Sequence, residues 1–185
     1  MTSDVNGRAS KFIAIAENLF GAMTSDWKYR GVEFYDLHPH LAYYPEHAEV
    51  AISLSFKARD DELQRDFQLA HEVCHLLYPA RDVETQTDPK IIVLNEGVST
   101  YFSLYILNSE HGSEAAFFAS ENIVTNSPNY FSAFEQVMSL LERDESAVKK
   151  LRKTQPKLND VKSSDFHAAG LSLSEREINS LLAYF

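Results

Sequence analysis

Cysteine, glycine and proline are all scarce in this sequence. Its single cysteine, Cys74, cannot form an internal disulfide, which excludes a small secreted scaffold held together by disulfides. Six glycines and six prolines in 185 residues exclude a collagen-like or low-complexity chain. The remaining composition, with 44% hydrophobic and 24% charged residues, is typical of a globular protein, and the length fits a single domain over residues 1–185.

Basic side chains are also fewer than acidic ones. The chain has 17 Lys and Arg side chains against 27 Asp and Glu side chains, which gives a formal net charge of −10. Nucleic-acid phosphates repel such a chain, so we expect no nucleic-acid partner. A short basic run at 149–153 is interpreted as the solvated face of a helix.

Long hydrophobic runs are missing. The uncharged apolar stretches fall well short of the roughly 20 residues that a membrane-spanning helix needs, so we expect no membrane partner. The first residues lack the basic start and apolar stretch of a signal peptide, which favours a cytoplasmic location. Secretion by a route without a cleavable signal stays an alternative, and the sequence does not indicate an oligomeric state.

Hydrophobic periodicity predicts an α+β fold in which strands come first and helices dominate the second half. The clearest strand is 49–56, where Val50, Ile52 and Leu54 share one face. The last helix opens with a capping box at 174–177. The full set comprises strands at 31–36, 41–44 and 49–56 and helices at 8–23, 60–78, 95–109, 113–124, 129–143 and 174–185, with a shorter basic helix before the last.

One motif points to chemistry. His71, Glu72 and His75 form an H-E-x-x-H pattern inside the helix predicted at 60–78. Residues four apart lie about 40° apart around a helix and one turn along it, so both imidazoles can reach one Zn²⁺ at about 2.0–2.1 Å. Glu72 is rotated by about 100° from His71 and can take a proton from a water beside the metal. The alternative, two packed histidines without a metal, carries a high desolvation cost.

A catalytic zinc needs a third protein ligand, for which Glu96 is the candidate. It opens the helix predicted at 95–109, where it could equally be an acidic residue near the positive helix end, with Asn95 as the cap. The competing carboxylates are in the polar loop at 80–90. They are Asp82, Glu84 and Asp88.

The motif at 71–75, followed by Leu-Asn-Glu-Gly at 94–97, resembles the gluzincin metallopeptidases, and the second segment is most similar to their aminopeptidase branch. The resemblance covers about residues 49–109. It implies a zincin-like fold, with a small mixed sheet whose edge strand lies beside the active-site helix. That helix closes the first part, 1–79, and the third-ligand helix opens the second, 80–185. The implied site is one zinc ion held by His71, His75 and Glu96, with Glu72 as general base and a peptide or protein as substrate.

The resemblance also implies a donor for the oxyanion that forms on the attacked carbonyl. A tyrosine or histidine downstream of the motif is expected. Tyr130 and His167 are our choices among candidates that also include Tyr101, Tyr105 and His111. Thr100 and Asn95 are predicted to hydrogen-bond the metal ligands.

Two questions stay open at this point. The strand 49–56 is either the edge strand that pairs with an extended peptide or an interior strand under the helix. The function is either zinc-dependent peptide hydrolysis or that of a zincin-fold regulatory or binding module with little catalysis. Hydrolysis of another bond is a third hypothesis, and the choice between terminal and internal peptide bonds is undecided.

Overall fold

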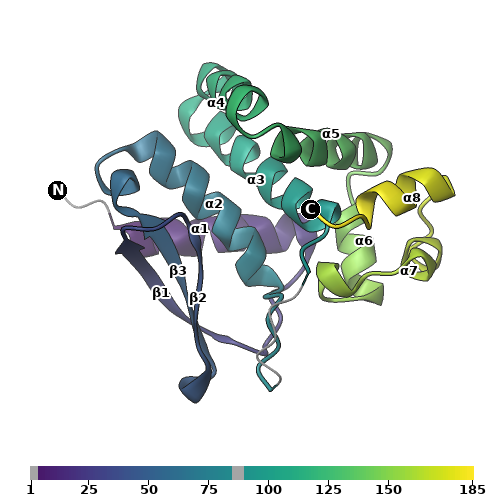
Figure 1. The fold of residues 1–185 in the computed structure, drawn as a ribbon, viewed down its shortest axis with the longest axis horizontal. Helices are drawn as coiled ribbons and strands as arrows, with labels where there is room; N and C mark the ends of the chain where they lie inside the picture. Colours follow the sequence, from purple (N-terminus) through teal and green to yellow (C-terminus); the bar gives the residue numbers. More distant parts are fainter. Residues whose placement is uncertain (1–3, 85–89) are drawn as a thin grey trace.

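Three strands form a small mixed sheet at one end of the protein (Figure 1). The computed structural model describes residues 4–84 and 90–185. Strand β3 (Glu49–Ser55) lies in the middle, with β1 (Lys28–Tyr35) parallel to it on one side and β2 (His40–Tyr44) antiparallel on the other. The predicted α+β class and small mixed sheet are confirmed.

The central position of β3 settles the question left open by the sequence, because 49–56 is the interior strand and the edge strands are β1 and β2. Val50, Ile52 and Leu54 are buried on one face of β3, but Ala51 and Ser53 on the other face are also only 1% exposed. Both faces are therefore covered. The edge strand β2 contacts α2 (Glu62–Leu77), the helix that carries the H-E-x-x-H motif.

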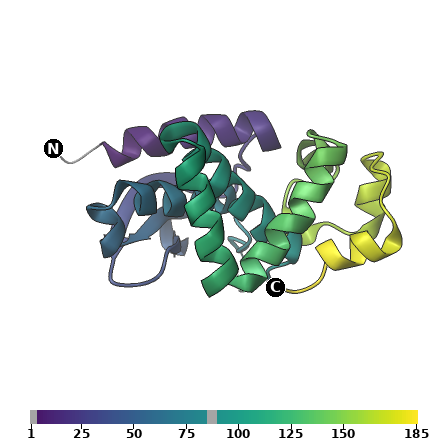
Figure 2. The same cartoon turned by 90° about the horizontal axis from the view of Figure 1, so that it is seen from above.

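Helices build the rest of the molecule. Helix α1 (Val5–Phe20) runs along the back of the molecule, behind α2 in the view of Figure 1, as the turned view in Figure 2 makes clear. Helix α3 (Val93–His111) packs against α2, and the C-terminal half is mainly helical, as predicted. The remaining helices are α4 (Ser113–Asn126), α5 (Pro128–Arg143), α6 (Ala147–Thr154), α7 (Ser163–Ala168) and α8 (Glu175–Leu181).

None of the helices within the described ranges combines the length and the apolar character that crossing a membrane requires.

All the predicted helices are present in the structure, and the differences concern the residues at which they begin and end. Helix α1 stops before Gly21, whose φ of 98° leaves the helical region, and so does not reach residue 23. The predicted last helix stops at Leu181, because Tyr184 pairs with Ile92 in an isolated antiparallel bridge. Helix α7 was not predicted, since its six residues are too few to show a helical period.

Helix α2 is positioned by local signals at both ends. Asp61 caps its start by accepting a hydrogen bond from the Gln64 amide at 3.0 Å. It ends at Leu77, because Tyr78 precedes Pro79 and is therefore disfavoured from helical geometry. The H-E-x-x-H motif thus occupies the last two turns of a helix whose ends are fixed.

Arg152 turns inward, whereas the sequence predicts a solvated face for the basic run 149–153. Arg152 is 7% exposed, and its guanidinium donates hydrogen bonds to carbonyl oxygens at the ends of two helices. Its Nη1 reaches the oxygens of Phe20 (3.1 Å) and Gly21 (2.7 Å) after α1, and its Nη2 reaches that of Leu77 (3.2 Å) at the end of α2. One cation therefore caps carbonyls at the ends of both helices, and the Leu77 oxygen also accepts from the Thr24 amide at 2.9 Å.

Replacing Arg152 by Met is expected to lower the free energy of unfolding by about 3 kcal/mol, because several buried carbonyls lose their donor. Urea denaturation measures the change. Lys153→Met, at the exposed neighbouring position, is the matched control and is expected to change stability by less than about 0.5 kcal/mol. Equal effects of the two substitutions would contradict the capping role.

Candidate metal centre

The structure brings His71, His75 and Glu96 together where the end of α2 meets the start of α3. The two Nε2 atoms of the histidines lie 3.1 Å apart. Glu96 Oε2 is 3.2 Å from His71 Nε2, and Glu96 Oε1 is 3.6 Å from His75 Nε2. Within the described residues, these three side chains form the one group of at least three whose ligand atoms all lie within 4.8 Å of one another. The group could hold a metal ion.

The spacing of these atoms fits tetrahedral coordination. Two atoms at 2.0–2.1 Å from one ion, separated by a tetrahedral angle, lie about 3.3 Å apart. The observed separations of 3.1, 3.2 and 3.6 Å lie near that value, and the two that involve Glu96 start from its two different carboxylate oxygens. Two imidazole nitrogens and a carboxylate oxygen are also the donor types that zinc prefers, and a set of three leaves one position open. A metal ion held by these three side chains alone would therefore keep one position free.

The charges of the site are strongly coupled. Burial alone lowers the pKa of His75, but the nearby Glu96 and Glu72 carboxylates outweigh it and raise that pKa to about 9. Burial alone raises the pKa of Glu96, but His75 and His71 hold it well below its usual range. The Glu96 carboxylate is therefore ionised at neutral pH, which a metal ligand requires.

A chain of amides fixes the orientation of the His75 ring. Asn159 Oδ1 accepts a hydrogen bond from the Ile92 amide at 3.3 Å, which identifies that atom as the oxygen. The same oxygen accepts from Asn95 Nδ2 at 2.9 Å, so Asn95 Oδ1 faces His75 Nδ1 at 3.2 Å. With a metal ion at Nε2, His75 would keep one proton, on Nδ1, where Asn95 Oδ1 can accept it. The predicted role of Asn95 as a partner of a ligand is thus supported by geometry, but it does not cap α3, which begins two residues earlier, at Val93.

Glu72 lies next to the metal position without belonging to the ligand group. Its side chain is 4% exposed and borders both cavities of the cleft described below. Burial raises the pKa of Glu72, and His75 and His71 offset this only in part. A carboxyl with a raised pKa beside a metal position suits a group that takes up and releases a proton.

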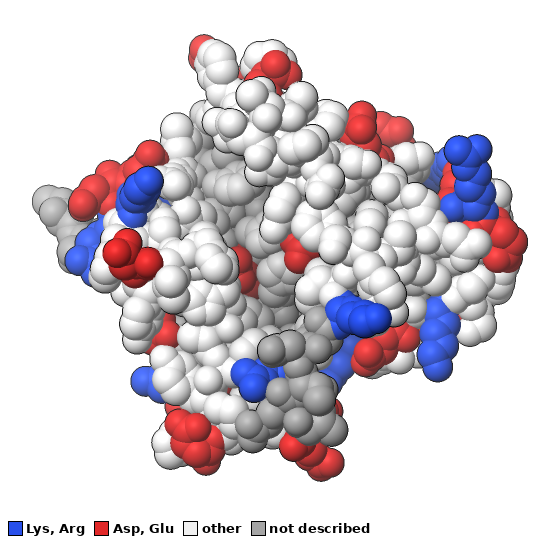
Figure 3. Space-filling view, viewed as in Figure 1, with Lys and Arg blue, Asp and Glu red and all other residues white. Residues whose placement is uncertain are grey.

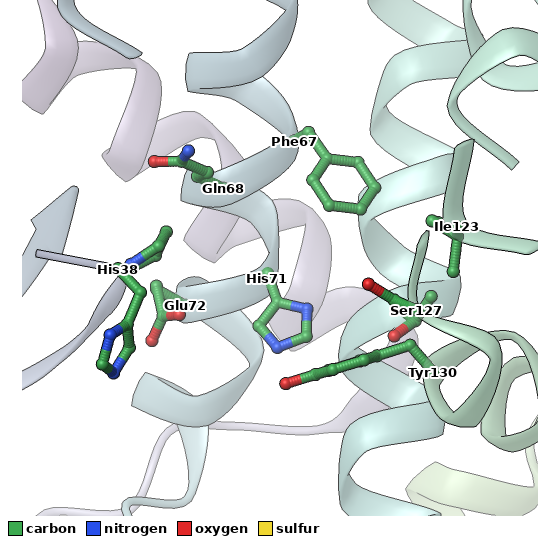
Figure 4. Close-up of a pocket in the computed structure, with 10 residues that line it drawn as sticks. His38, Phe67, Gln68, His71, Glu72, Ile123, Ser127 and Tyr130 are labelled. Carbon is green, nitrogen blue, oxygen red and sulfur yellow. The ribbon is translucent and has the colours of Figure 1, made fainter. Parts of the chain in front are cut away.

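The site opens into a cleft with two cavities. Figure 3 shows the hollow on this face, with acidic atoms deep inside and mostly uncharged atoms around it. We call the first the edge-strand cavity. It has a volume of about 430 Å³ and is lined by the metal-site group, by Tyr130 and by Leu41 and Tyr43 of β2. We call the second the inner cavity. It has a volume of about 230 Å³ and lies beyond His71, between α2, α3 and α4, as Figure 4 shows in close-up.

Tyr130 is the oxyanion-donor candidate that the structure places at the site. It comes from α5, and its ring lies 5.9 Å from that of His71, with the hydroxyl beside the imidazole (Figure 4). Burial, reinforced by Glu96 and Glu72, raises the pKa of Tyr130 to about 12, so the hydroxyl keeps its proton at neutral pH. A neutral hydroxyl at this place can donate a hydrogen bond.

His167 is not brought to the site. It lies on α7, where its Nε2 is 3.3 Å from Glu175 Oε1, and it lines neither cavity. The remaining candidates are also elsewhere. Tyr101 and Tyr105 line a separate hollow between α1, α3 and α5, and His111 is paired with the buried Asp66 at 2.7 Å. Sequence position alone did not separate these residues from Tyr130.

Thr100 differs from its predicted role. It lies one turn after Glu96 on α3, but its hydroxyl is not hydrogen-bonded to any of the described residues and it lines the inner cavity. Cys74 points away from the ligands, with its Sγ 3.9 Å from the Val98 carbonyl oxygen. Of the competing third ligands, Asp82 accepts a hydrogen bond from the Glu84 amide in the loop after α2, and Asp88 lies outside the described residues.

Sequence reasoning missed two residues of this site. Asn159, in a 3₁₀ turn after α6, is far from Asn95 in the sequence and carries no motif. His38, just before β2, lines both cavities, and no motif in the sequence marks it. Comparison with known proteins adds no further member to the site, since no protein-family model, no curated protein and no solved structure matches this chain.

Proposed function

We propose that this protein is a zinc-dependent peptidase with a zincin-like fold. The observation that carries the proposal is the meeting of His71, His75 and Glu96 at tetrahedral spacing beside a buried Glu72. When bound there, zinc supplies Lewis acidity and lowers the pKa of adjacent water. Support for peptide as the substrate comes from the strand edge next to the site.

The chain's own residues provide the other parts of the reaction. Glu72 takes the proton of the attacking water and delivers it to the leaving amine, a role that its raised pKa favours. The Tyr130 hydroxyl donates a hydrogen bond to the oxyanion that develops on the carbonyl. Asn95 keeps the His75 ring in the orientation that presents Nε2 to the metal.

The edge strand β2 offers a place for the substrate backbone. It pairs with β3 on one side, and within the described part of the chain no strand lies on its other side. Residues Leu41 and Tyr43 of β2 line the edge-strand cavity together with Glu72. An extended peptide can add to this edge through main-chain hydrogen bonds, with its scissile bond at the metal position.

Metal analysis combined with a peptide-cleavage assay tests the proposal. We expect one zinc per chain, cleavage of a fluorogenic peptide library, loss of cleavage after chelation and recovery when zinc is added back. His75→Ala is expected to lose both zinc and cleavage. Protein that binds no divalent cation contradicts the metal centre, whereas zinc-loaded protein that cleaves no peptide contradicts the peptidase and favours the binding module.

Replacing Asn95 by Ala is expected to weaken zinc binding by about 10- to 100-fold, because the His75 ring loses the acceptor that fixes its tautomer. Competition against a zinc chelator dye measures the affinity. Asn108→Ala, at an exposed position on the same helix, is the matched control and is expected to leave affinity unchanged. Unchanged affinity in Asn95→Ala would contradict the proposed role of the amide chain.

A further inference from the structure

The inner cavity extends the cleft beyond the reacting atoms. In Figure 4, Phe67, Ile123 and Ser127 lie on one side of His71, and Glu72 and His38 lie on the other. Ile123 is the buried residue of α4, at 8% exposure, and its side chain forms part of the cavity wall. The cavity therefore lies where a side chain next to the scissile bond would project.

The size of the cavity suits a large side chain. Its volume is about 230 Å³. A cavity of about 150 Å³ lined by apolar side chains is sufficient to hold benzene. Phe67 and Ile123 supply the apolar wall, so an aromatic ring would be well buried there.

The charges around the inner cavity disfavour a charged substrate side chain. The residues that line the inner cavity, as far as the chain is described, include no lysine or arginine, and their one acidic residue is Glu72. A carboxylate entering the cavity would meet that glutamate, and an ammonium group would compete with its role at the metal. A carboxylate would thus be buried beside a like charge, and an ammonium group would occupy the carboxylate that the proposed reaction needs, so neither is favoured there.

One polar group in the cavity wall has no partner. Thr100 is 1% exposed, and its Oγ1 makes no hydrogen bond to the described residues. The neighbouring Gln68 is different, because its Oε1 accepts from the Ser55 amide at 3.1 Å and its Nε2 donates to Ser55 Oγ at 2.9 Å. A buried hydroxyl without a partner is uncommon, so Thr100 points to a group supplied by a ligand.

We propose that the inner cavity binds a large uncharged side chain of the substrate, adjacent to the scissile bond, and that Thr100 hydrogen-bonds its tip. Tyrosine combines an aromatic body with a terminal hydroxyl and is therefore the preferred residue. The inference rests on the peptidase function proposed above and adds the substrate class to it.

The preference for a large uncharged residue can be tested with a peptide library. Zinc-loaded protein cleaves the library, and mass spectrometry maps the cut sites. We expect large uncharged residues at one position beside the cut. In peptides that differ only by Tyr or Phe at that position, kcat/KM is expected to be about five- to tenfold higher for Tyr. Thr100→Val is expected to bring the Tyr-to-Phe ratio close to one, and Thr100→Ser to preserve it.

The wall of the cavity provides a second test. Ile123→Trp fills the cavity and is expected to lower kcat/KM for Tyr and Phe peptides more than tenfold relative to an Ala peptide. Val124→Trp, at a 41% exposed position on the same helix, is the matched control. Zinc content shows that each variant is folded.

The outcomes separate the two proposals. Cleavage without preference for a large residue, or an unchanged Tyr-to-Phe ratio in Thr100→Val, overturns the inner-cavity inference and leaves the peptidase standing. Failure of zinc-loaded wild-type protein to cut any peptide overturns both.

Discussion

Replacing Glu72 by Gln is expected to lower kcat for peptide cleavage by 10²- to 10⁴-fold while the protein keeps its zinc. The amide has nearly the same shape as the carboxyl, but it cannot accept the proton of the attacking water. Since Glu72 does not belong to the group formed by His71, His75 and Glu96, zinc stoichiometry should stay at that of wild type. Metal analysis and single-substrate kinetics on the same preparation measure the two quantities.

The control for this change is Glu62→Gln on the same helix. Glu62 is at the exposed start of α2, with 57% of its side chain accessible, far from the ligands at the other end of the helix. It is expected to keep wild-type kcat. If Glu72→Gln keeps both its zinc and its activity, the assignment of Glu72 as general base is contradicted. Loss of zinc in that variant would instead place Glu72 among the ligands.

The parts of the site that could be predicted from sequence are those fixed by local geometry. The relation between His71 and His75 follows from helical spacing, and the structure places their Nε2 atoms 3.1 Å apart. Glu96 was chosen from its place at the start of the next predicted helix and from its resemblance to a family segment, because helical spacing says nothing about which helix packs beside α2. Tyr130 could not be separated from other tyrosines, since its place beside His71 depends on how α5 crosses α3.

Strand β3 shows why the sheet was harder to predict. Its alternation of large apolar residues with Ala51 and Ser53 is typical of a strand with one face in solvent. The structure buries that second face as well, although its side chains are small. Pattern alone does not distinguish a small residue at a close contact from a small residue at a surface. The order of the three strands, and with it the identity of the edge strand β2, therefore required the three-dimensional fold.

Gly97 is a further case in which the structure, and not the sequence, explains why a glycine occupies the position. It directly follows Glu96 on α3, and its φ is not positive, so backbone freedom does not require glycine there. A Cβ atom at this position would lie 2.4 Å from the carbonyl oxygen of Ala133 and 2.6 Å from Val137 Cγ2. Both atoms belong to α5, so Gly97 marks the point where α3 and α5 cross closely.

Gly97→Ala is consequently expected to destabilise the protein by about 2–3 kcal/mol, even though alanine is the better helix former. The nearest atom is a backbone oxygen, so α5 has to move as a whole and carry Tyr130 away from His71. Activity should therefore fall further than zinc content. Thermal unfolding, zinc analysis and kcat measure the three effects, with Ser109→Ala on the exposed face of α3 as control. Adding Val137→Ala removes only the side-chain clash and should restore little, and full recovery in that double variant would contradict the backbone origin of the effect.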